Sequence, residues 1–164
     1  KVLDIQECVL MQGLNNRLRN GIREFVTKES IPFYDLRSHK GVLRGMMLRI
    51  STTGEVMLLI QARVECDNDK VLLEKVLQYV AAEFPEVTSL LYVINNKCND
   101  TFGDLEVVTY KGTDVIYEEM EGLRFKVGPK SFYQTNSKQA YNLYKVAREF
   151  AHPGWVSFAV VPLH

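Results

Sequence analysis

The first part of the chain contains an apolar stretch followed by a helical pattern of apolar residues. Residues 2–10 are apolar enough for a strand. Beyond Gly13, apolar residues recur at helical spacing and predict a helix: Leu14, Leu18, Ile22, Phe25 and Val26. Pro32 ends this region, so the first predicted unit is a strand followed by a helix.

The middle of the chain contains a predicted hairpin, helix and strand. Residues 42–50 and 55–64 flank Ser-Thr-Thr-Gly, a short turn with the glycine where positive φ is easiest. Residues 67–69, Asp-Asn-Asp, supply N-cap side chains for a second helix, which Pro85 stops. Residues 87–95 are β-branched and nearly all apolar, as is typical of a central strand.

This order of elements predicts the fold of residues 1–98. It is the split βαββαβ order of an α+β, ferredoxin-like domain, in which two helices cover one face of a four-stranded antiparallel sheet. Residues 99–150 begin with a mostly polar segment. Three short strands are predicted after it, at 105–112, 115–122 and 123–128. We predict that these strands form a small β appendage, followed by a C-terminal linker helix.

The C-terminal helix is predicted to begin at a cap. Asn136 can cap it, and Gln139 completes a capping-box pattern. The apolar stripe of this helix consists of Leu143, Val146, Ala147 and Phe150. Phe132, Tyr133 and Gln134 therefore lie directly before a helix N-terminus, where free N–H groups and the helix dipole favour a polar or anionic ligand.

Two interpretations fit these three residues. Adjacent aromatic rings offer a stacking surface for a nucleic-acid base, and a glutamine amide can both donate and accept at the edge of a heterocycle. In the alternative, Phe132 and Tyr133 only hold the helix against the core. Spacing alone favours this structural alternative over ligand binding.

Composition and charge limit the classes of partner. The chain of 164 residues is 46% hydrophobic, enough for the core of one domain. Twenty basic and twenty acidic residues give zero net charge, so a nucleic acid would have to be met by a local patch. No apolar run approaches the roughly 18 residues of a membrane span and no signal peptide is recognisable, so we expect a cytoplasmic protein without a membrane partner.

Three stretches resemble one enzyme family. "FKVGPKSFYQTN", residues 125–136, resembles the motif F-x-(I/V)-x-P-x-x-F-(F/Y)-Q-(V/T)-N of RNA uracil-C5 methyltransferases, which use S-adenosylmethionine on 23S rRNA or tRNA. "HKGVLRGMMLRISTTGEVMLLI", residues 39–60, is similar to the central-domain hairpin of that family. "ECVLMQGLNNRLRNGIREF", residues 7–25, is similar to its cysteine-containing strand and helix. The resemblance covers residues 2–150.

The resemblance implies that the catalytic residues belong to a lobe outside this chain. In the family, a cysteine thiolate adds to C6 of a flipped uracil and a general base later removes the C5 proton. Both groups, and the glycine-rich loop for the methyl donor, belong to a C-terminal Rossmann-like lobe whose motifs do not occur here. We therefore expect no catalytic residue, no bound cofactor and no methylation from this chain alone.

The resemblance also implies a binding site in the intact protein. The glutamine that corresponds to Gln134 lies at the methyl-donor site and near the target base, and Phe132 and Asn136 are expected to shape the same pocket wall. The expected partner of the intact protein is RNA, with 23S rRNA favoured over tRNA. The oligomeric state does not follow from the sequence.

Residues 151–164 depart from the family pattern. The first strand and glycine-rich loop of the Rossmann-like lobe should follow the linker helix, but the sequence reads "AHPGWVSFAVVPLH". Two explanations fit: an isolated central domain with a trimmed boundary, or a shifted reading frame after about Ala151. We favour the second.

Cys8 matches the position of a metal ligand in the family. Many members hold a 4Fe-4S cluster with three cysteines in a C-x5-C-x2-C run and a fourth far downstream, which Cys8 resembles. The first three would precede Lys1, so Cys8 alone cannot hold a cluster. The alternative is a buried strand cysteine that acts as a small hydrophobe. The other cysteines and histidines have no metal-ligand spacing: Cys66, Cys98, His39 and His152.

Basic residues and fold analogy leave a second function open. Seven basic residues can contact RNA phosphates if they converge, and otherwise serve solubility: Arg17, Arg19, Arg23, Arg37, Lys40, Arg44 and Arg49. The alternative to a methyltransferase part is a free-standing ferredoxin-like module that senses a ligand or binds RNA. Fold analogy alone supports that alternative.

Overall fold

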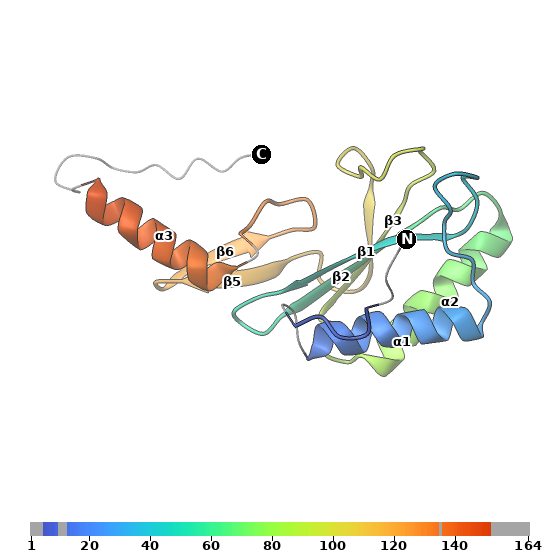
Figure 1. The fold of residues 1–164 in the computed structure, drawn as a ribbon, viewed down its shortest axis with the longest axis horizontal. Coiled ribbons are helices and arrows are strands. Elements are labelled where there is room, and N and C mark those ends of the chain that lie inside the picture. The colour runs from blue at the N-terminus through green and yellow to red at the C-terminus, as the bar shows by residue number, and fades with distance from the viewer. Residues whose placement is uncertain (1–4, 10–12, 135, 152–164) are drawn as a thin grey trace.

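The chain folds into a four-stranded sheet with two helices, a separate hairpin and a third helix. A computed structural model describes residues 5–9, 13–134 and 136–151 (Figure 1). The elements, in chain order, are α1 (Leu14–Lys28), β1 (Leu43–Ile50), β2 (Val56–Ala62), α2 (Asp67–Glu83), β3 (Ser89–Ile94), β4 (Val107–Gly112), β5 (Ile116–Met120), β6 (Leu123–Val127) and α3 (Ser137–Phe150). The predicted α+β class is confirmed.

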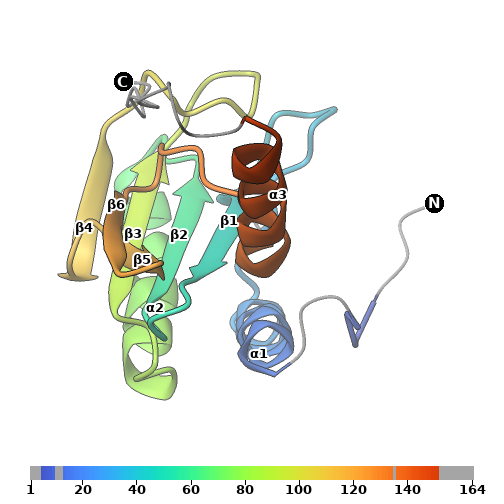
Figure 2. The same ribbon diagram turned by 90° about the vertical axis from the view of Figure 1, so that its left-hand side faces the viewer.

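The main sheet is mixed, and the predicted all-antiparallel sheet is wrong in this respect. Its strand order is β1-β2-β3-β4, as Figure 2 shows from right to left. The β1–β2 and β3–β4 pairs are antiparallel, but β2 and β3 are parallel. The reason is the connection: α2 carries the chain back along the sheet, so β3 starts at the same end as β2. Parallel neighbours need such a crossover.

Two predicted strands are placed differently in the structure. Residues 5–9 form no strand, and the rest of the strand predicted over residues 2–10 lies outside the described residues. The first strand of the predicted appendage, β4, instead pairs with β3 and completes the main sheet. Only β5 and β6 form a separate two-stranded sheet. An unpaired β3 edge would expose a row of backbone donors and acceptors, which β4 satisfies.

Strand β2 is buried on both faces of the sheet. Val56, Leu58 and Ile60 belong to the core that α1 and α2 cover. Met57 and Leu59 point to the opposite face, where they join a second core formed with the hairpin and the chain that follows it. The helix layer and the β5–β6 hairpin therefore lie on opposite sides of one strand, and α3 lies beyond the hairpin, away from α1 and α2 (Figure 1, Figure 2).

The N-cap of α2 is Cys66, which directly precedes the predicted Asp-Asn-Asp segment, and Asp69 of that segment reaches back to it as the third helical residue of a capping box. The helix begins at Asp67, and the Asp69 carboxylate accepts from the backbone N–H groups of Glu65 at 2.9 Å and Cys66 at 3.3 Å. Both donors precede the first helical residue, so these bonds fix the chain at its entry to the helix.

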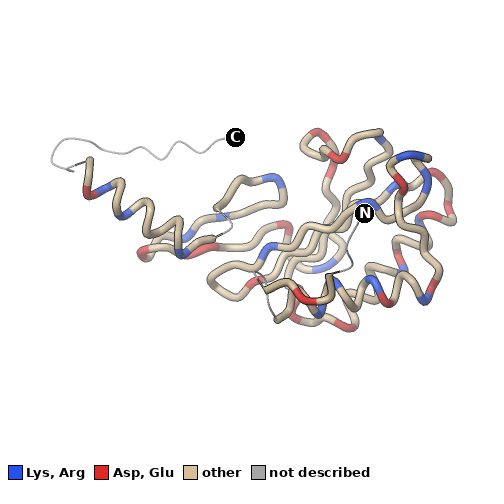
Figure 3. The backbone as a smooth tube through the Cα atoms, in the orientation of Figure 1, with Lys and Arg blue, Asp and Glu red and all other residues tan. Residues whose placement is uncertain are grey.

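Basic and acidic residues are interspersed along the described chain (Figure 3). None of the helices in the described residues is long and apolar enough to cross a lipid bilayer.

Candidate functional site

The predicted site lies on a short turn between the hairpin and α3, residues 128–136, which we call the site turn. It leaves β6 at Gly128, whose N–H donates to the Ser131 hydroxyl at 3.1 Å. The Ser131 N–H donates back to the Gly128 carbonyl at 3.2 Å. These two bonds close the first half of the turn.

Side chains of the site turn point in alternating directions. Phe132 is 81% exposed, and Gln134 is exposed as well. Tyr133, between them, packs against the second core, with its ring centroid 6.4 Å from that of Phe125. Only one of the two adjacent aromatics therefore anchors the turn. The interpretation that these rings hold the helix against the core therefore fits Tyr133 but not Phe132.

Burial of Tyr133 changes its acidity. Loss of solvent around the ring raises the pKa of its hydroxyl, and the nearby Glu118 carboxylate raises it further. The hydroxyl is buried without a hydrogen bond of normal geometry, although the neighbouring Ser137 hydroxyl offsets part of the pKa rise. Tyr133 therefore stays protonated at neutral pH and serves as an anchor.

Asn136 caps α3 as predicted. Its side-chain oxygen accepts from the Gln139 N–H at 3.1 Å, and its carbonyl accepts from the Ala140 N–H at 2.9 Å. The cap fixes the direction in which the chain leaves the site turn. The role of Asn136 in a pocket wall stays a prediction, as do the roles of Phe132 and Gln134.

Most of the apolar stripe of α3 is exposed. Ala140 is the one buried residue of the helix within the described chain. Leu143, Val146 and Phe150 of the predicted stripe are 60%, 45% and 81% exposed. Soluble domains rarely leave a row of large apolar side chains uncovered.

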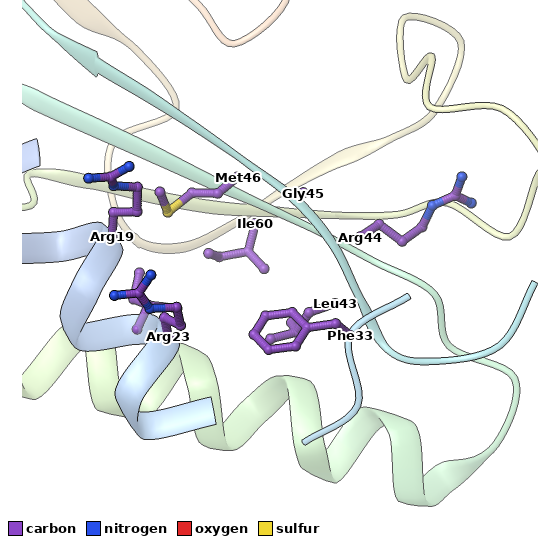
Figure 4. A pocket seen from close by; sticks show the side chains of 9 residues that line it. Arg19, Arg23, Phe33, Leu43, Arg44, Gly45, Met46 and Ile60 are labelled. Carbon is purple, nitrogen blue, oxygen red and sulfur yellow. The ribbon is translucent and has the colours of Figure 1, made fainter. Parts of the chain in front are cut away.

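The site turn borders a hollow but does not enclose one. A hollow of about 390 Å³ lies at its first half, lined by Glu106, Val107, Asp114, Gly128, Pro129, Lys130 and Ser131. Neither Phe132 nor Gln134 lines it. A second, more apolar hollow of about 300 Å³ lies between α1 and β1, on the helix-covered face of the sheet (Figure 4). The predicted site residues thus stand on an open surface.

Cys8 offers a single thiol. It is half-buried and not in a disulfide, and its backbone N–H donates to the Asn16 side chain at 3.0 Å. Among the described residues no group of three or more His, Cys, Asp or Glu side chains can hold a metal ion. A 4Fe-4S cluster takes four ligands, and the described residues can supply one of them, Cys8.

The candidate RNA-contacting arginines divide into separate groups. Arg19, Arg23 and Arg44 line the hollow between α1 and β1, but the Arg44 side chain runs away from the other two and binds the loop after β3 (Figure 4). Arg17 instead pairs with Glu86 at 2.9 Å. Arg49 lies on the other face, where its guanidinium reaches the Gly128 carbonyl of the site turn at 3.5 Å and burial lowers its pKa. Phosphate contact by these residues stays a prediction.

One residue behind the site turn, Glu118, was not predicted from the sequence. This carboxylate is only 4% exposed and accepts hydrogen bonds from the hairpin turn between β1 and β2. A signal for it existed, because Ile116, Glu118 and Met120 alternate with Tyr117 and Glu119 along β5. That alternation places Glu118 on the same face as the buried Ile116.

Sequence comparison relates the chain to RNA methyltransferases. No protein-family model matches it. It is 54% identical over 151 residues to an uncharacterized RNA methyltransferase of Bacteroides thetaiotaomicron, covering 92% of this chain and 33% of that protein. It is 32% identical over 151 residues to the tRNA (uracil(54)-C(5))-methyltransferase of Pyrococcus furiosus, covering 91% of this chain and 34% of that one.

A solved structure matches as well. The crystal structure of the Pyrococcus abyssi tRNA (uracil-54, C5)-methyltransferase in complex with S-adenosyl-L-homocysteine aligns with a TM-score of 0.69 and 28% identity, over 91% of this chain and 35% of that one. These matches confirm the family resemblance drawn from the sequence motifs. The chain spans about a third of the length of the curated relatives it matches.

Proposed function

We infer that this chain is one part of an RNA uracil-C5 methyltransferase, and that within the intact enzyme it positions the RNA base and lines the methyl-donor site. Two kinds of observation support the proposal. The chain is homologous to a segment of RNA methyltransferases over about nine-tenths of its length. The motif residues that the family resemblance assigns to binding stand exposed on one turn.

The observation that carries the proposal is the alternation in the site turn. Tyr133 packs against the second core, so it anchors the turn between the exposed Phe132 and Gln134. An exposed aromatic ring suits stacking on a flipped base, and an exposed amide suits the edge of a heterocycle. Purely structural residues would be expected to point inward with Tyr133.

The exposed stripe of α3 supports the proposal that this chain belongs to a longer protein. Leu143, Val146 and Phe150 face solvent in this chain. In the proposed enzyme, the catalytic lobe covers them and places its own residues opposite Gln134. This chain alone then presents one wall of the active site and carries out no methylation.

In the proposed enzyme, this chain contributes binding residues and the other lobe contributes the catalytic ones. S-adenosylmethionine supplies an electrophilic methyl group, and Gln134, with Phe132 and Asn136 beside it, forms the part of its site that belongs to this chain. The residues of this chain orient the uracil ring and keep it out of the RNA stack. The cysteine nucleophile and the general base belong to the lobe outside it. Cys8 is proposed as one of four cluster ligands of the intact protein.

The RNA substrate is part of the proposal. The sequence resemblance favoured 23S rRNA, whereas the relatives from the two Pyrococcus species carry names that specify tRNA uracil 54. Both RNAs present a uracil that must be flipped, so the site turn suits either.

The decisive experiment uses the intact gene product. Unmodified 23S rRNA and tRNA are incubated with it and S-adenosylmethionine, and 5-methyluridine is measured by mass spectrometry. We expect methylation by the unaltered enzyme and a loss of at least about 100-fold in kcat/KM in Gln134→Ala, because a misplaced base loses its near-attack geometry. Gln78→Ala, on the exposed face of α2, is the matched control.

Two outcomes contradict the proposal. One is the absence of 5-methyluridine in both RNAs. The other is unchanged kcat/KM in Gln134→Ala, which would favour the free-standing module that senses a ligand or binds RNA. That alternative has lost part of its support, because its ferredoxin-like analogy assumed an all-antiparallel sheet and β2 and β3 are parallel.

A further inference from the structure

Glu118 is a buried carboxylate at the junction of three segments. Its side chain projects from the inner face of β5 and is 4% exposed. One carboxylate oxygen, Oε2, accepts from the Thr52 N–H at 3.0 Å and from the Thr52 hydroxyl at 2.6 Å. The other, Oε1, accepts from the Ser137 hydroxyl at 3.4 Å. Glu118 thus joins the β1–β2 turn to the first residue of α3.

All of these partners are neutral. Among the residues that the structure describes, Glu118 forms no ion pair with Lys, Arg or His. A carboxylate removed from water without a cation is expensive, even with good hydrogen bonds. An apolar residue at this place would leave the Thr52 N–H and hydroxyl without this acceptor, so the role of the carboxylate lies in the hydrogen bonds that it makes to two separate segments.

The hairpin itself is held in other ways. The Thr53 hydroxyl donates to the Tyr117 carbonyl at 2.7 Å, and the Tyr117 N–H donates to the Glu55 carboxylate at 2.6 Å. The Glu119 N–H donates to the Thr52 hydroxyl at 3.2 Å. None of these bonds reaches the site turn or α3. Glu118 supplies the link from the β1–β2 turn to α3.

The second half of the site turn lies near this carboxylate. Ser137, which Glu118 binds, directly follows the Asn136 cap. Tyr133 is near enough for the charge of Glu118 to raise the pKa of its hydroxyl further, after the larger effect of burial. The exposed pair Phe132 and Gln134 is therefore held by the Tyr133 anchor between them and, on the α3 side, by the bond from Ser137 to Glu118.

We propose that Glu118 is a positioning residue that fixes the site turn against the main sheet, so that Phe132 and Gln134 are presented in one orientation. Its carboxylate accepts from the β1–β2 turn on one side and from the start of α3 on the other. The functional part of this inference rests on the proposed methyltransferase function, but the structural part does not.

The structural part is tested in this chain by hydrogen exchange. In Glu118→Ala, we expect amide exchange in residues 128–140 to become about tenfold faster or more, because the junction loses its shared acceptor. Exchange in α1, residues 14–28, should not change. Glu118→Gln retains an acceptor for Thr52 and should restore most of the protection. Glu119→Ala, on the exposed face of the same strand, is the matched control.

The functional part is tested in the intact enzyme. We expect Glu118→Ala to lower kcat about tenfold or more with a smaller change in the KM for RNA, and Glu118→Gln to recover most of kcat. If the unaltered enzyme does not methylate RNA, the proposed function fails while the exchange result still stands. Unchanged exchange in residues 128–140 of Glu118→Ala overturns the inference. Equal acceleration in residues 14–28 and 128–140 also overturns it, since that pattern means general unfolding.

Discussion

The guanidinium of Arg148 donates to both carboxylate oxygens of Glu121, at 2.7 and 2.8 Å. Arg148 lies in the last turn of α3, and Glu121 lies between β5 and β6. This pair ties the far end of α3 to the hairpin, as Glu118 ties the near end. The hydrogen bonds from Arg148 are the largest cause that lowers the pKa of Glu121 to about 2.

Acidification should release this end of α3. The pKa of Glu121 is lower in the folded chain than its ordinary value of 4.5, so the pair contributes stability above pH 4.5 and loses it as the pH falls toward 2. An NMR titration of the Glu121 carboxyl carbon measures this pKa. In Arg148→Met it should return toward 4.5. A midpoint near 4.5 in the unaltered chain would show that the bidentate pair does not form in solution.

Gly112 should tolerate no side chain. It ends β4 at a φ of 81°, and a Cβ there would overlap the Thr88 carbonyl oxygen. Gly54 has a similar φ of 87° with no atom near its Cβ position, so Gly54→Ala reports the backbone cost alone, about 1–2 kcal/mol. We expect Gly112→Ala to lower the free energy of unfolding by clearly more than Gly54→Ala in urea denaturation. Equal losses would remove the steric explanation.

Arg44 should not be replaceable by lysine. Its side chain is fully buried, and its guanidinium donates to the carbonyls of Asn95 at 2.7 Å and Asn99 at 3.0 Å and to the Asp100 carboxylate at 2.8 Å. A lysine ammonium cannot reach all three acceptors from one point, so the carbonyl of the buried Asn95 or the two acceptors of the exposed loop lose their partner. We expect Arg44→Lys to lower the free energy of unfolding by about 3 kcal/mol, measured by urea denaturation.

Arg17→Lys is the control for that substitution. Arg17 pairs with Glu86 at the surface, where its side chain is 60% exposed. Exposed pairs contribute about 0–1 kcal/mol, so the change should lie within that range. A loss for Arg44→Lys no larger than that for Arg17→Lys would mean that the loop after β3 does not depend on the guanidinium.

The exposed stripe of α3 should contribute little to the stability of this chain. Leu143 is 60% exposed, so Leu143→Gln should change the free energy of unfolding by no more than about 0.5 kcal/mol. Leu58, on β2, is fully buried, and Leu58→Ala should cost about 2–5 kcal/mol. Thermal and urea denaturation of both variants measure this contrast. A large loss in Leu143→Gln would show that this chain covers the stripe itself.

Local pattern predicted most of the elements. The helical spacing of Leu18, Ile22 and Val26 became the buried face of α1, and the Asn136 cap formed with Gln139 as expected. These features depend on neighbouring residues, which the sequence displays directly. Strand pairing depends on contacts between distant residues, and so the parallel β2–β3 pair and the place of β4 were not predicted.

The candidate site was predicted in part. The motif selected Phe132 and Gln134, and the structure places both on the surface. Which of the two adjacent aromatics faces the core could not be read from their spacing, because a turn has no fixed period. The role of Glu118 was not predicted for a different reason: its partners, Thr52 and Ser137, are remote from it in the sequence.

The double burial of β2 has a consequence for how the chain folds. Since Leu58 and Leu59 supply neighbouring layers, neither layer can complete its core while this strand is detached. We expect both to melt in one cooperative transition, and a nascent chain that has not yet paired β2 to expose an apolar segment prone to aggregation.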